Sequence, residues 1–154
     1  MGPHALQAAG VLTGIRRLER GLRLAARTAE RATALSAAQL FVLEKLAEAE
    51  ASSIADLAAR THTDRSSVSA VIDRLASAGL VSRSAALQDR RRTETRITKR
   101  GRAVLERAPL SPTATLVRAL ERLPASRVRQ LDAALAALNE ALGYTQTTML
   151  FEDD

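Results

Sequence analysis

The sequence predicts a mainly α-helical fold with one small β-hairpin, and three observations carry this prediction. Apolar residues make up 46% of the 154 residues and aromatic residues 2%, so the core has to be built from Ala, Leu, Val and Ile, a mixture that favours helices. Apolar positions recur at helical spacing over most of the chain. The period changes after Gly79, where residues 80–86 and 93–98 form two short β-tolerant segments around a polar stretch.

Apolar spacing and capping residues place the individual helices. The predicted helices cover residues 6–35, 36–49, 54–60, 65–78, 99–108, 113–123 and 124–142. Side chains expected to cap their first turns are Ser36 with Gln39, Ser53 with Asp56, Asp64, and Thr98. Gly79 is expected to end the fourth helix in the left-handed conformation. Pro109 and Pro112 are expected to interrupt the helical pattern.

The net charge of +6 is concentrated in one part of the sequence. Residues 83–102 hold eight basic and two acidic side chains, a net charge of +6, so the rest of the chain sums to about zero. This basic run overlaps the predicted hairpin and lies between ordered-looking segments. It favours a surface that binds a polyanion. A solvated face or a disordered tail is the alternative.

Residues 54–78 have the pattern of two short helices joined by a short turn, and the basic hairpin follows them. This order is that of a winged helix-turn-helix. The second helix of such a motif needs small polar side chains at its start so that the backbone can approach base edges, and residues 65–70 (Arg-Ser-Ser-Val-Ser-Ala) supply them. Serines at a helix start can also merely satisfy local backbone groups. Together with the basic hairpin, they favour the reading of DNA.

Five short segments occur in a fixed order along the chain. They are residues 53–58 (Ser-Ile-Ala-Asp-Leu-Ala), 66–69 with 72–75 (Ser-Ser-Val-Ser and Ile-Asp-Arg-Leu), 78–81 (Ala-Gly-Leu-Val), 89–92 (Asp-Arg-Arg-Arg) and 97–101 (Ile-Thr-Lys-Arg-Gly). In this order and spacing, the sequence resembles the MarR family of bacterial regulators over nearly its whole length. The resemblance implies a homodimer that presents two winged heads to a pseudo-palindromic site on double-stranded DNA.

The resemblance also implies a division of the chain. Residues 1–35 would be an N-terminal dimerisation helix, 36–100 the winged helix-turn-helix domain, 101–143 the C-terminal dimerisation helices and 144–154 a loosely held tail. The terminal helices of the two copies would interleave.

The recognition helix carries the first group of residues that the resemblance assigns to DNA. Arg65, Ser66, Ser67 and Ser69 would contact bases and phosphates, and Arg74 would lie near the DNA backbone or pair with the wing. Residue 70 departs from the family pattern because it is alanine where many relatives carry arginine. One usual contact is therefore missing, and the wing is expected to supply more of the affinity.

The wing carries the second group. By resemblance, Asp89 would orient an arginine, and Arg90, Arg91 or Arg92 would enter the minor groove, where narrow A·T-rich segments attract guanidinium. The sequence does not distinguish among the three arginines.

A small aromatic or anionic effector is the further ligand that the resemblance implies, bound in a cleft between the dimerisation helices and the winged head. The candidate lining residues are Ile15, Arg16, Leu18, Leu22 and Phe41, with Leu43 and Arg23. Ordinary core packing and solvated charge explain the same residues equally well.

Several function classes are not expected. The chain has no cysteine, and its only histidines are His4 and His62, so neither a metal site nor a cofactor is predicted. No phosphate loop or catalytic arrangement stands out, so the chain is not expected to be an enzyme. No apolar run reaches the roughly 20 residues that span a bilayer, and the N-terminus lacks signal-peptide features, so a cytoplasmic protein without a membrane partner is expected.

The sequence therefore predicts a sequence-specific DNA-binding transcriptional regulator, a homodimeric and ligand-responsive repressor. Repression is favoured because a dimer bound at a promoter blocks polymerase without further parts. The alternative is a winged-helix module for protein interaction or DNA architecture, in which DNA binding is incidental.

Overall fold

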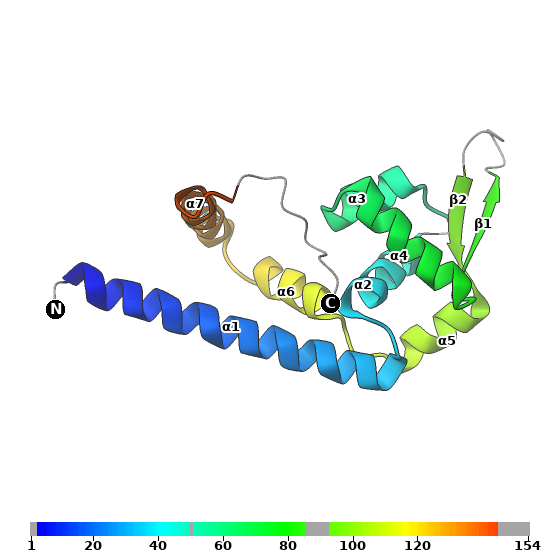
Figure 1. Cartoon of the computed structure of the whole chain (residues 1–154), viewed down its shortest axis with the longest axis horizontal. Coiled ribbons are helices and arrows are strands. Elements are labelled where there is room, and N and C mark those ends of the chain that lie inside the picture. Colours follow the sequence, from blue (N-terminus) through cyan, green and yellow to red (C-terminus); the bar gives the residue numbers. More distant parts are fainter. Residues whose placement is uncertain (1–2, 50, 86–92, 145–154) are drawn as a thin grey trace.

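The computed structural model describes residues 3–49, 51–85 and 93–144 (Figure 1). In chain order its elements are α1 (Pro3–Thr33), α2 (Ala37–Ala47), α3 (Ile54–Thr61), α4 (Arg65–Ser77), β1 (Val81–Ala85), β2 (Thr93–Ile97), α5 (Lys99–Arg107), α6 (Pro112–Glu121) and α7 (Ala125–Ala141). The two strands form one antiparallel sheet. The predicted fold class is confirmed.

The helices begin where side-chain caps satisfy the free backbone N–H groups of the first turn. Ser36 Oγ accepts from the Gln39 N–H at 3.3 Å, and the Gln39 side chain accepts from the Ser36 N–H at 2.9 Å, which is the predicted capping box. Ser53 and Asp56 repeat this arrangement at the start of α3. Thr98 caps α5, as expected. Gly79 has the left-handed φ of 70° expected for a glycine that ends a helix.

The predicted bounds of the helices differ from the observed ones by at most three residues. The first helix was expected to reach Leu35, but α1 ends at Thr33 because Ala34 takes a left-handed φ of 58° and turns the chain. The helical pattern is interrupted at residues 108–111, which include Pro109, as expected, but Pro112 already lies in the first turn of α6, behind the N-cap Ser111. A proline is well tolerated there because its missing N–H would have had no partner in the helix.

The core lies between α2, α3, α4 and the base of the hairpin. It is built from aliphatic side chains of these elements, including Leu40, Leu43 and Leu46 of α2, Leu57 of α3, Val68, Ile72 and Leu75 of α4, and Leu80, Val81 and Ile97 at the hairpin base. α2 contacts the other elements of this core as well as α1, α5 and α6. The apolar face of α4 is thus held from within, which leaves its outer face for other contacts.

The root of the hairpin is held by close backbone packing against α5. A Cβ at Gly101 would stand 2.3 Å from the Leu80 carbonyl oxygen, so only glycine allows this approach. Thr98 Oγ1 donates to the Gly79 carbonyl at 2.8 Å from the same place. The position of the wing relative to α4 therefore depends on this contact.

The first and last helices lie largely outside the core. In Figure 1, α1 runs along one long edge of the molecule, α6 packs beside it and α7 stands apart from both. Within the described part of the chain α7 has no buried residue, and Leu131, Leu135, Leu138 and Leu142 are all exposed. None of the helices in the described ranges is long and apolar enough to cross a membrane.

Candidate nucleic-acid interface

The turn between α3 and α4 sets the direction of the second helix. His62 ends α3 with a left-handed φ of 53°, and the Thr63 N–H donates to the Ala58 carbonyl at 3.0 Å. Asp64 follows in extended conformation as the N-cap of α4. Only residues 62–64 therefore separate α3 from α4, and the first turn of α4 lies at the surface.

Asp64 gathers the polar groups at the start of α4. Its carboxylate accepts hydrogen bonds from the Ser66 hydroxyl, from the Ser67 N–H at 2.9 Å and from the Ser67 hydroxyl at 2.6 Å. The hydrogen bond from Ser66, followed by those from Ser67, holds the pKa of Asp64 well below its usual range. A permanent negative charge therefore sits at the exposed end of the helix that was predicted to meet DNA.

The predicted contact residues of α4 lie in different settings. Arg65 and Arg74 are exposed, and Ser69 is half-buried. The hydroxyls of Ser66 and Ser67 are engaged by Asp64 in this conformation. Asp64 was predicted from sequence as an N-cap, but its hydrogen bonds with the Ser66 and Ser67 hydroxyls were not. A capping carboxylate does not need to accept from neighbouring hydroxyls, so the pattern of residues does not predict these bonds.

A shallow hollow lies between the starts of α2 and α4, with a volume of about 220 Å³. Its lining residues are Ser36, Ala38, Ser66, Ser67, Ala70, Val71 and Arg74. Two helix N-termini, each a weak centre of positive charge, and one arginine border it. Ala70 contributes only a methyl group to this lining. The hollow is thus bordered by serine hydroxyl groups and one guanidinium group.

The wing is joined to α4 by an ion pair. Arg83 of β1 contacts Asp73 of α4, with 2.6 Å between guanidinium nitrogen and carboxylate oxygen. Backbone hydrogen bonds between Ser52 and Thr95, at 3.0 and 2.8 Å, fasten β2 to the segment before α3. Neither Asp73 nor Arg83 was predicted as a functional residue, because nothing in the residue order indicates that their side chains meet.

The tip of the wing lies outside the described residues. Asp89, Arg90, Arg91 and Arg92 all belong to this tip. Their assignment to the minor groove therefore stays a prediction.

The residues predicted to line an effector cleft do not share one cavity in the single chain. Leu18 and Leu22 line a groove of about 520 Å³ between α1 and α6, and Arg16 lines a different hollow on α1. Ile15 is 42% exposed on α1, whereas Phe41 is buried. Of the further candidates, Leu43 is buried in the core, and Arg23 lines the same hollow as Arg16.

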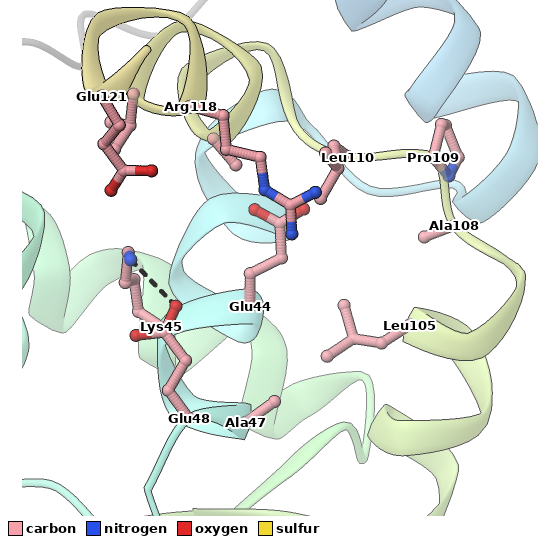
Figure 2. Close-up of a pocket in the computed structure, with 12 residues that line it drawn as sticks. Glu44, Lys45, Ala47, Glu48, Leu105, Ala108, Pro109, Leu110, Arg118 and Glu121 are labelled. Carbon is pink, nitrogen blue, oxygen red and sulfur yellow. Dashed lines mark hydrogen bonds and ion pairs between the residues drawn. The ribbon is translucent and has the colours of Figure 1, made fainter.

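A more polar pocket of about 340 Å³ lies where α2, α5 and α6 meet. Figure 2 shows Glu44 and Arg118 turning into it from α2 and α6. Glu44 also accepts hydrogen bonds from the N–H and hydroxyl of Ser111, at 2.7 and 2.6 Å. Burial raises the pKa of the neighbouring Glu48, but hydrogen bonds from Lys45 and Arg60 outweigh it and bring that pKa below its usual value. Glu44, Lys45 and Glu48 at this pocket are thus already engaged in hydrogen bonds within the chain.

The winged-helix segment matches a known protein family. The model of the MarR family covers residues 35–93, which run from the end of α1 to the start of β2. Residues 35–93 form a MarR-family domain. A search of curated proteins finds no match for the chain.

Solved structures share the MarR-type fold over nearly the whole chain. A MepR-like protein in complex with pseudoligands is 24% identical, with a TM-score of 0.59 over 94% of this chain and 98% of that one. BldR, a transcriptional regulator from Sulfolobus solfataricus, is 25% identical, with a TM-score of 0.56 over 94% and 100% of the two chains. A mutant of MarR from E. coli in complex with operator DNA is 22% identical, with a TM-score of 0.59 over 86% and 95%. The match to the MarR family indicates a DNA-binding transcriptional regulator.

Proposed function

We propose that this chain is a homodimeric transcriptional repressor that binds a pseudo-palindromic site on double-stranded DNA. The observation that carries the proposal is the exposed start of α4, with Arg65 on it and the wing joined to the same helix by the Arg83–Asp73 ion pair. In this arrangement α4 enters the major groove and the wing contacts the adjacent minor groove. The hollow beside Arg74 accepts a backbone phosphate.

The dimeric state is proposed from the surfaces of α1 and α7. Large apolar side chains stay exposed on both helices in the single chain; they include Val11, Ile15 and Leu18 on α1 and Leu131 and Leu135 on α7. Monomeric proteins rarely leave such large apolar side chains exposed on two helices, and exposed apolar surface of this kind marks an interaction site. A second copy with the same surfaces would cover both.

A gel shift against the promoter of its own or the adjacent gene tests the DNA-binding part. We expect a specific complex that survives excess competitor DNA at moderate salt. Binding that competitor removes in proportion to its concentration would favour the alternative, a winged-helix module with incidental DNA affinity. Repression is read from a reporter under the same promoter, whose output should rise when the gene is deleted.

The assignment of the wing tip is tested by Arg91→Ala. We expect weaker binding to all sequences and a slope of log affinity against log salt that is shallower by about one, because one phosphate contact is lost. Since Arg90 and Arg92 flank this position, the same substitution at each is the internal comparison. An unchanged affinity and slope for all three would overturn the assignment.

We further propose that the groove between α1 and α6 holds the effector, because Leu18, Leu22 and Leu116 give it an apolar lining and Arg17 adds a positive charge to that lining. This composition suits an aromatic anion. Benzoate is the simplest probe: saturating benzoate should lower the affinity for the promoter, and Leu22→Glu should abolish that response. A response that survives Leu22→Glu would place the effector elsewhere, with the α2–α5–α6 pocket as the next site to test.

A further inference from the structure

The wing is not the only concentration of positive charge in this molecule. Residues 3–33, which form α1, contain six arginines and two glutamates, a net charge of +4. This excess is hidden in the sum over the chain because residues 36–82 and 103–154 each carry a net charge of −2. The helix contains no lysine, so its whole positive charge is guanidinium.

Four of the arginines lie on one face of α1. Arg16, Arg20, Arg23 and Arg27 follow one another at spacings of four, three and four residues, which keeps them within a stripe roughly 60° wide. All four are exposed, and together with Glu19 and Leu24 they line one elongated hollow of about 670 Å³. We call these four residues the arginine ridge. It extends for about 16 Å along the helix.

The ridge lacks enough negative charge of its own. Among the residues that the structure describes, Arg23 forms an ion pair with Glu19, one helical turn before it. Arginines three or four positions apart on a helix repel one another and destabilise it. An anion lying along the ridge would relieve this repulsion, so the arrangement is better suited to a bound state than to the free helix.

The ridge faces away from the rest of the chain. The groove that α1 forms with α6 is lined by residues including Gly14, Leu18 and Ala25, and these lie on the opposite side of the helix from Arg16 and Arg27. In Figure 1, α1 runs along one edge of the molecule while the hairpin and α3 lie toward the other. A DNA duplex seated on α4 and the wing would therefore not reach the ridge.

We propose that the arginine ridge binds the phosphate backbone of a second nucleic-acid segment, so that the protein can hold two duplex segments at once. A duplex presents a phosphate about every 3.4 Å along each strand, so a ridge of this length faces more than enough phosphates for four arginines. Guanidinium binds phosphate in a bidentate manner, which suits an all-arginine surface. The proposal rests on the proposed function, because DNA held at the winged head brings further duplex close to the ridge.

A two-duplex capture assay tests the proposal. The promoter duplex is immobilised, the protein is bound to it, and a fluorescent duplex of unrelated sequence is then added. The ridge variant carries Arg16→Ala, Arg20→Ala and Arg27→Ala, in which alanine preserves the helix. The matched control carries Arg122→Ala, Arg127→Ala and Arg129→Ala, which remove the same charge from exposed positions at and beyond the end of α6.

We expect the ridge variant to capture the second duplex at least about tenfold more weakly, with a salt slope shallower by about two to three, while its binding to the first duplex stays within about twofold. The control variant with Arg122→Ala, Arg127→Ala and Arg129→Ala should capture the second duplex as well as the natural protein does. Equal capture by all three proteins, or equal loss in both variants, would overturn the proposal.

Two further outcomes are decisive. If a polyglutamate peptide binds the natural protein but not the ridge variant, and the second duplex binds neither, the ridge serves an acidic protein partner and the proposal is wrong. If Arg65→Ala leaves promoter binding unchanged, the proposed function fails at the winged head. Direct binding of the unrelated duplex to the natural protein and to the ridge variant then still decides whether the ridge binds nucleic acid.

Discussion

At the scale of single residues, Asp64 is the most informative side chain of the interface. It stabilises α4 as its N-cap, yet it also places a carboxylate where DNA phosphates would approach and draws in the hydroxyls of Ser66 and Ser67. These two effects oppose each other in DNA binding. Under the proposed function, Asp64 would order the start of α4 and lower its affinity for DNA.

The substitution Asp64→Asn separates the two effects. Asparagine caps a helix about as well as aspartate, so the thermal unfolding midpoint should change little. The negative charge is lost and the serine hydroxyls are held less firmly, so affinity for all DNA sequences should rise several-fold at low salt and less at high salt. Asp64→Ala is the control that also removes the cap. Weaker binding by the asparagine variant would show that the carboxylate itself contacts DNA.

The lowered pKa of Asp64 also determines how its contribution to stability depends on pH. Because the folded-state pKa is below the unfolded value of about 3.9, the stability that this group contributes is present above the unfolded pKa and is lost only as the pH falls through the folded one. Circular dichroism melts between pH 5 and 8 should therefore show no difference between the natural protein and Asp64→Asn that varies with pH.

Gly101 supports the wing by its lack of a side chain. A Cβ there would stand 2.3 Å from the Leu80 carbonyl oxygen, and a backbone atom cannot move away as a flexible side chain can. Gly101→Ala should cost about 1–3 kcal/mol in the free energy of unfolding, measured by urea denaturation. Gly10→Ala on α1, where nothing lies within 4 Å of the added Cβ, is the matched control and should stabilise by about 0.5–1 kcal/mol.

At the scale of elements, the wing and α4 are coupled through Arg83 and Asp73. The pair is partly exposed, 36% and 60% for the two side chains, so its loss should change the free energy of unfolding by no more than about 1 kcal/mol. In the proposed complex with DNA, it would hold the wing at a fixed angle to α4. Arg83→Ala should therefore weaken promoter binding while leaving stability nearly unchanged.

A double-mutant cycle checks this coupling. In the Arg83→Ala background, Asp73→Ala should have no additional effect on promoter affinity, because the wing is already released. Additive losses from the two substitutions would mean that each residue acts on DNA separately and that the ion pair does not position the wing.

The start of each helix could be predicted from sequence where the cap is local. Ser36, Ser53, Asp64 and Thr98 find their partners within three residues, so residue order alone contains the information. The cap at Ser111 shows the limit. Its hydroxyl accepts from the Ala114 N–H, but both its N–H and hydroxyl also donate to Glu44, 67 positions away, and such a contact exists only after α2 and α6 have packed.

At the scale of the whole molecule, charge was the property most easily misread from sequence. The excess of positive charge in residues 83–102 is real. The remaining residues sum to about zero only because the arginines of α1 are balanced by acidic residues elsewhere in the chain. Helical geometry brings Arg16 and Arg27 onto one face although they are eleven positions apart. The effector residues show the reverse, since Phe41 and Leu18 share apolar character but one is buried and the other lies on the surface.

The proposed dimer makes the last prediction, and it concerns the exposed leucines of α7. Leu131 and Leu135 are 42% and 47% exposed and lie on one face of a helix that has no buried residue in the described structure. If a second copy covers this face, Leu131→Asp with Leu135→Asp would bury two unpaired charges in the interface, a cost of several kcal/mol that a dimer cannot offset. Light scattering after size exclusion should then give the mass of one chain.

The matched control places the same charges on the other side of α7. Ala133→Asp with Ala137→Asp lies across the helix from Leu131 and should leave the dimer mass unchanged. Because two heads joined in a dimer bind a pseudo-palindromic site far more tightly than one, the leucine variant should also lose specific promoter binding, whereas its single heads keep weak, salt-sensitive affinity for any duplex. A leucine variant that stays dimeric would mean that α7 faces solvent in the assembly and that α1 alone joins the two copies.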